Sequence, residues 1–113
     1  MSPLPVIVFL LFHNHFFYYD IVFQGCRFEG ELTSPPPWRL LQTLQTQEFQ
    51  FESRTGFTSG NCTYYIPVLR AEVDFQWYYN ARNGHEFYGI TAHPQFDTFL
   101  TWTNKINYYV SDL

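Results

Sequence analysis

Residues 73–91 read VDFQWYYNARNGHEFYGIT, and this run carries the clearest structural pattern in the chain. The pattern in residues 73–79 has a period of two, as expected for a strand with one buried face. Val73, Phe75, Trp77 and Tyr79 alternate with Asp74, Gln76 and Tyr78. Asn83-Gly84 then leads into a second run, residues 85–91. Because Asn and Gly both tolerate the positive φ of a tight turn, the sequence predicts a β-hairpin here.

Further strand patterns lie on both sides of this hairpin. Residues 26–33 and residues 49–57 alternate in the same way, so each predicts a half-buried strand. Residues 62–69 are rich in Tyr, Ile and Val but include Pro67, which predicts an edge strand or a bulge because proline has no N–H to donate. Residues 96–110 fit either a helical stripe or two strands. We predict strands, since Thr, Trp, Ile, Tyr and Val favour a pleated surface.

One segment predicts a helix. Residues 34–37 read SPPP, in which the serine is a common N-cap and proline is favoured in the first helical turn. Trp38, Leu41 and Leu44 follow at intervals of three. We therefore expect a short helix over residues 36–47, with an exposed polyproline segment as the alternative.

The composition is that of a small folded chain. Its 113 residues include 13 Phe, 9 Tyr and 3 Trp, while charged residues make up only 14%, against roughly 25% in average domains. We predict one domain over residues 1–113, with an apolar segment at 1–23 and a β-rich body at 24–113. The predicted class is mainly β, with one or two short helices and a single antiparallel sheet that is curved or is barrel- or sandwich-like.

The beginning of the chain is unusually apolar. Residues 4–12 read LPVIVFLLF, and the first charged residue is Asp20. We favour a core element or a segment covered by a partner. The alternative is a secretory signal or a membrane anchor over residues 4–23, although this segment has no basic start and includes two histidines. Secretion, membrane association and a cytoplasmic location all remain open.

The two cysteines, Cys26 and Cys62, allow two interpretations. They could form one disulfide, or they could be two buried free thiols. Residues 61–63 read Asn-Cys-Thr, which matches the acceptor pattern for N-glycosylation, a short pattern that also occurs by chance.

Charge and motifs exclude several kinds of activity. The net charge is −4, and the six basic residues are scattered singly, so we predict no nucleic-acid partner. His13-x-His15 on a strand would place two imidazoles on one face, but a metal set would need further ligands from residues 85–86 or His93. We predict no metal and no cofactor.

We predict a non-catalytic binding or protein-interaction module that uses exposed Tyr and Trp side chains, because these residues combine a large apolar area with a polar tip. The expected partner is another protein or a second copy, and a small apolar or sugar ligand is the alternative. The predicted contact residues are Trp77, Tyr78, Tyr79, Tyr88 and Trp102.

The alternative function is a small acid–base enzyme of the lyase, isomerase or hydrolase type. Histidine and carboxylate side chains in an aromatic pocket could move protons near neutral pH. The catalytic candidates under this alternative are His85, Glu86, His93 and Asp97.

Overall fold

The computed structural model describes residues 6–16, 19–29, 31–32, 42–93, 97–102 and 105–111. These residues form nine strands and one turn of 3-10 helix, which confirms the prediction of a mainly β chain. The elements are β1 (Val6–Asn14), β2 (Val22–Glu29), β3 (Glu31–Leu32), β4 (Thr46–Ser53), β5 (Phe57–Ile66), η1 (Pro67–Leu69), β6 (Ala71–Asn80), β7 (His85–His93), β8 (Asp97–Trp102) and β9 (Ile106–Ser111).

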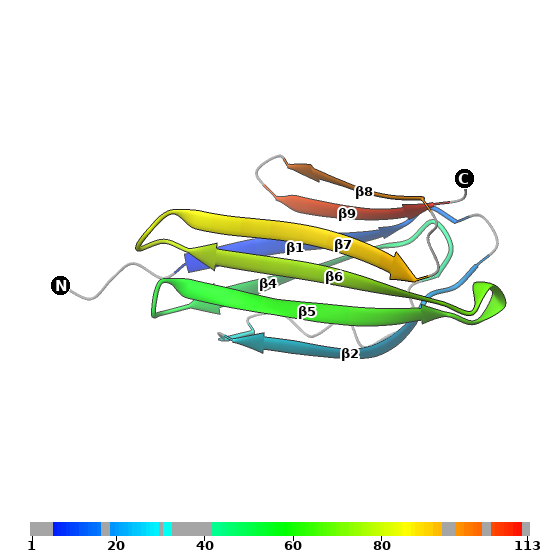
Figure 1. The fold of residues 1–113 in the computed structure, drawn as a ribbon, viewed down its shortest axis with the longest axis horizontal. Helices are drawn as coiled ribbons and strands as arrows, with labels where there is room; N and C mark the ends of the chain where they lie inside the picture. The colour runs from blue at the N-terminus through cyan, green and yellow to red at the C-terminus, as the bar shows by residue number, and fades with distance from the viewer. Residues whose placement is uncertain are drawn as a thin grey trace.

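The strands form two sheets, one in front of the other in Figure 1. The five-stranded sheet has the order β3-β4-β1-β9-β8, and the four-stranded sheet has the order β2-β5-β6-β7. Neighbouring strands are antiparallel, apart from the parallel pair β1–β9. The prediction of a single sheet is therefore wrong, and the sheets do not close into a barrel. Alternation shows that a strand has one buried face, but it does not show which sheet covers that face.

The predicted hairpin is confirmed as β6 and β7. The two strands pair in continuous register from Glu72–His93 to Asn80–His85. At the turn, Gly84 has a φ of 71° and donates its N–H to the Asn80 carbonyl oxygen at 2.9 Å. The strand prediction for the last part of the chain is also confirmed, by β8 and β9.

The predicted helix over residues 36–47 is wrong where the structure describes it. Residues 42–45 form a turn, in which Gln45 donates its N–H to the Gln42 carbonyl oxygen at 3.0 Å, and Thr46 begins β4. Residues 36–41 lie outside the described residues. Strand β4 pairs with β1 along eight residues of each, and this long-range pairing outweighs the local helical spacing.

The predicted edge strand over residues 62–69 is wrong as well. Strand β5 lies between β2 and β6 and pairs with both of them. Pro67 lies just beyond the strand, at the start of η1. The first residue of a helical turn has no intrahelical partner for its N–H, so proline removes no ladder hydrogen bond there.

The apolar beginning of the chain includes β1, which lies between β4 and β9. Its Leu10 and Phe12 side chains are completely buried. Among the described residues, no helix has the length and apolarity needed to cross a bilayer.

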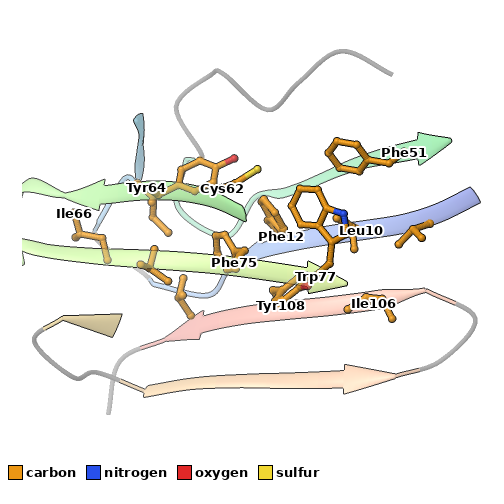
Figure 2. Packing of buried hydrophobic residues seen from close by; sticks show 14 of the residues in the cluster. Leu10, Phe12, Phe51, Cys62, Tyr64, Ile66, Phe75, Trp77, Ile106 and Tyr108 are labelled. Carbon is orange, nitrogen blue, oxygen red and sulfur yellow. The ribbon is translucent and has the colours of Figure 1, made fainter. Parts of the chain in front are cut away.

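Seven of the fifteen buried residues in the described core are aromatic, and several of their rings meet between the sheets (Figure 2). The Phe12 ring of β1 stacks on the Phe75 ring of β6, with centroids 4.0 Å apart and planes inclined by 20°. Tyr64 and Tyr108 each meet Phe12 edge to face. The stack thus joins the two sheets at the middle of the core.

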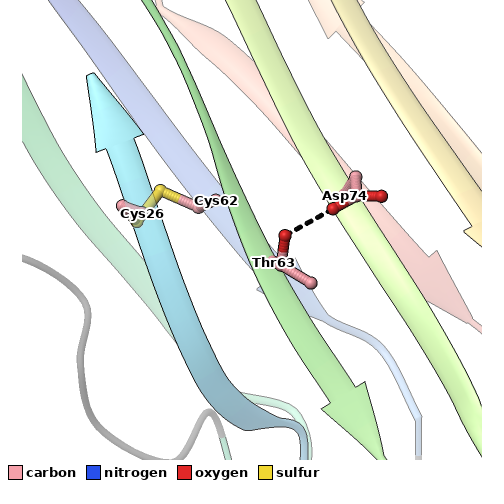
Figure 3. Close-up of a disulfide and its surroundings, with 4 residues drawn as sticks. All are labelled: Cys26, Cys62, Thr63 and Asp74. Carbon is pink, nitrogen blue, oxygen red and sulfur yellow. Dashed lines mark hydrogen bonds between the residues drawn. A yellow bond between two sulfur atoms is a disulfide. The ribbon is translucent and has the colours of Figure 1, made fainter. Parts of the chain in front are cut away.

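Cys26 and Cys62 form a disulfide, which decides between the two interpretations of the sequence (Figure 3). The two residues lie directly opposite each other on β2 and β5. The bond therefore holds an outer strand of the four-stranded sheet to its neighbour.

Removing this disulfide with the double variant Cys26→Ala/Cys62→Ala should lower the free energy of unfolding by about 4 kcal/mol, because the closed loop spans 36 residues and its closure restricts the unfolded chain. Urea denaturation of the oxidised wild type and the double variant measures the difference, and the reduced wild type is the control. A difference below about 1 kcal/mol would contradict the prediction.

A second stability prediction concerns Gly60, whose missing side chain makes room for Trp77. A Cβ atom built at Gly60 would lie 2.5 Å from Cζ2 of the Trp77 ring and would also clash with the Arg27 carbonyl oxygen. Gly60→Ala should therefore cost about 2 kcal/mol through overpacking. Gly25→Ala is the matched control, because nothing lies within 4 Å of a Cβ there. Equal thermal stability of the two variants would rule out this explanation.

Candidate functional site

The predicted contact residues lie in different parts of the structure. Trp77 is 2% exposed and its indole N–H donates to Oγ1 of Thr58 at 3.3 Å, so this ring belongs to the core. Tyr79 and Tyr88 pack partly buried against the same core. Tyr78 lies on the opposite, outer face of the sheet. Trp102 is in β8, where the structure describes its backbone only.

The outer face of the four-stranded sheet carries three neighbouring rings, from Phe57, Tyr78 and Phe87, which we call the aromatic cluster. Phe57 and Tyr78 meet edge to face, with centroids 5.3 Å apart. Tyr78 lies directly opposite Phe87 in the β6–β7 register, and Phe87 is 57% exposed. The three rings come from three adjacent strands at the end of the sheet that holds the β6–β7 turn (Figure 1).

The Phe87 ring lies against the backbone of Gly89, two residues along the same strand face. A Cβ atom at Gly89 would approach the ring to 3.0 Å and Oε1 of Gln76 to 3.2 Å. Because Gly89 has no side chain, the Phe87 ring can pack directly over its backbone. A ring that is supported in this way loses less conformational entropy when it is buried by a partner.

Polar side chains occupy the part of this outer face that lies nearer to β2. Thr63 donates its hydroxyl hydrogen to Oδ1 of Asp74 at 2.5 Å (Figure 3). Beside this pair, a hollow of about 240 Å³ is lined by Gln24, Gly25, Cys26, Arg27, Asn61 and Thr63. The β2 strand has an irregular register between Phe23 and Gly25, and Gly25 has no side chain to fill the space. The outer face thus has an aromatic end and a polar end.

A second cluster, on the outer face of the five-stranded sheet, is built around His13. The Asn107 amide donates an N–H to the Lys105 carbonyl oxygen at 3.2 Å, so its Oδ1 is the atom that faces His13 Nε2 at 2.9 Å. Nε2 therefore carries the hydrogen of the neutral ring, and Nδ1 accepts from the Thr46 hydroxyl at 2.8 Å. The Tyr109 ring stacks on His13, with centroids 4.4 Å apart.

Burial lowers the pKa of His13 from its ordinary value of 6.5, and the neighbouring His15 adds to this effect, while the hydrogen bond to Asn107 opposes it. The first of these causes is the largest, because the charged imidazolium loses contact with water. The folded protein thus prefers a neutral His13.

The predicted consequence is a loss of stability on acidification. As the pH falls below 6.5, the unfolded chain binds the His13 proton first, so the free energy of unfolding should decrease until the pH falls below the lowered pKa of the folded state. His13→Gln should flatten this part of the pH profile, as measured by urea denaturation between pH 7.5 and about pH 4.5. Gly25→Ala, which changes no titratable group, should keep the wild-type slope. An unchanged slope in His13→Gln would contradict the prediction.

The catalytic candidates do not come together. His85 and His93 lie at opposite ends of β7, about 26 Å apart at the usual rise of a strand. Glu86 is exposed next to His85, and Asp97 begins β8, where only the backbone is described. In the described part of the chain, no three His, Cys, Asp or Glu side chains are grouped so that they could hold a metal ion.

The aromatic cluster was only partly predictable. Tyr78 is among the predicted contact residues and the predicted hairpin places Phe87 across from it, whereas Phe57 is not predicted. Strand parity was the available signal, because it places Tyr78 on the face opposite Trp77 and Tyr79. The partners of Tyr78 depend on the pairing register of β5, β6 and β7.

Comparison with known proteins adds no relatives. The chain matches no protein-family model, no curated protein and no solved structure at a significant level.

Proposed function

We propose that this protein is a non-catalytic binding module, and that the aromatic cluster is the centre of its contact with a partner protein. The observation that carries this proposal is the set of three adjacent outward rings, one of them 57% exposed, on a face of a paired sheet. Tyr and Phe side chains are enriched at protein interfaces, and Tyr is among the residues whose truncation costs the most binding energy.

The shape of the cluster favours a protein over a small ligand. The rings stand on the open face of three strands, and such a surface is complementary to a second broad surface. Ser59 and Gln76 lie next to the rings in the register of the sheet and supply polar groups at the margin. An apolar centre with a polar margin is the usual arrangement of a protein interface.

The geometry gives less support to the acid–base enzyme. Its two histidines are separated by the length of β7, so they cannot act on the same substrate atom. The His13 cluster uses both ring nitrogens in hydrogen bonds to Thr46 and Asn107, neither of which is an acid or a base near neutral pH.

The proposal is tested by photo-crosslinking from the cluster in an extract of the cells that express the protein. Phe87→p-benzoylphenylalanine should crosslink to one partner protein. Val68→p-benzoylphenylalanine is the matched control, because Val68 is 69% exposed but lies in η1, at the other end of the sheet (Figure 1). Equal crosslinking from the two positions, or none from position 87, would refute the proposal.

The affinity for the captured partner gives the quantitative prediction. Phe87→Ser should weaken binding about tenfold or more, as expected when a central aromatic side chain of an interface is truncated. Val68→Ser, an exposed apolar residue outside the cluster, should change the dissociation constant by less than about twofold. Isothermal titration calorimetry with the purified partner measures both. Equal weakening by the two substitutions would place the contact elsewhere.

A further inference from the structure

We infer that Asn61 is a site of N-linked glycosylation, at the polar end of the outer face of the four-stranded sheet. Three independent observations meet at this residue: the acceptor pattern Asn61-Cys62-Thr63, the disulfide formed by its middle residue, and the outward, partly exposed position of the Asn61 side chain.

The acceptor pattern is short, and the disulfide adds evidence about the cellular compartment in which the chain folds. Disulfides form and persist in oxidising environments such as the endoplasmic reticulum and the extracellular space. Attachment of N-linked sugars takes place in proteins that enter this route. The disulfide at Cys62 therefore indicates that the chain folds in the compartment where N-linked sugars are attached to this acceptor pattern.

The face on which Asn61 lies follows from the strand. Cys62, the next residue, is completely buried and bonded to Cys26, so its neighbours Asn61 and Thr63 point to the other side of the sheet. Figure 3 shows Thr63 directed away from the disulfide. The hydroxyl of Thr63 is engaged by Asp74, and it shares the outer face with Asn61.

The Asn61 amide differs from the other described asparagines. Asn14, Asn80, Asn83 and Asn107 all use their side chains in hydrogen bonds to the backbone or to side chains. For Asn61 the described part of the chain contains no such bond. Its side chain instead borders the hollow of about 240 Å³ beside Gly25, which leaves room for the first sugar of a glycan.

The reaction is a transfer of a preassembled oligosaccharide from a lipid-linked pyrophosphate donor. A bond forms between Nδ2 of Asn61 and C1 of the first sugar, and the bond between C1 and the pyrophosphate oxygen breaks. The lipid pyrophosphate leaves with the electron pair, and the amide nitrogen loses one proton. No electron transfer is involved, so the donor lipid is the only co-reactant.

The test is expression of the full chain in cultured human cells, directed into the secretory pathway by an added cleavable signal sequence. Intact-mass measurement before and after treatment with peptide N-glycosidase F should show that most secreted wild-type chains carry one glycan. Asn61→Gln and Thr63→Ala should both be secreted at the mass of the bare polypeptide. Thr63→Ser is the matched control, since it keeps both the acceptor pattern and a hydroxyl for Asp74, and it should be glycosylated.

Two results would overturn the inference. One is wild-type protein that is secreted with its disulfide formed but without a glycan on most molecules. The other is a glycan that persists in Asn61→Gln. If a variant is not secreted, the mass of its intracellular form decides in the same way, because sugar transfer precedes secretion.

Discussion

The ring of Phe12 stacked on the ring of Phe75 is the contact on which the rest of this structure depends. Phe12 belongs to β1 inside the five-stranded sheet, and Phe75 belongs to β6 inside the four-stranded sheet. Tyr64 and Tyr108 pack edge to face around the stack, and the Tyr108 hydroxyl donates to the Gln76 backbone carbonyl oxygen of the opposite sheet. Such pairs add stability beyond the apolar area that they bury. The main structural role of these aromatic side chains is therefore to join the two sheets.

The core also determines what the surfaces can present. In a regularly paired strand the side chains alternate, so a residue that faces the core places its two neighbours on the outer face. Trp77 packs inward against Phe51 and over Gly60, and this directs Tyr78 outward next to Phe57 and Phe87. The aromatic cluster is thus held by pairing on both sides of β6, which gives the rings the fixed positions that an interface requires.

The proposed glycosylation site and the aromatic cluster lie on the same outer face of the four-stranded sheet. Cys26 and Cys62 hold β2 to β5 at the polar end, where Asn61 borders the hollow beside Gly25. The cluster lies toward the β6–β7 turn: Phe57 is four residues of β5 away from Asn61, about 13 Å along a strand, and Tyr78 lies opposite Ser59, two residues away from Asn61. A glycan directed over the hollow toward β2 would border the protein-binding end without covering it. The two proposals therefore describe neighbouring parts of one face.

Local pattern alone was sufficient for the β6–β7 hairpin and for the strand character of the last part of the chain, because side-chain period and turn residues act over a few residues. It also placed Tyr78 and Trp77 on opposite faces, but it could not say which of the two faces is buried. The number of sheets, the inner position of β5, the strand that begins at Thr46 and the Cys26–Cys62 bond were decided only by tertiary structure. Each of them depends on which distant strand lies alongside, and a strand's own residues determine its alternation but not its neighbours.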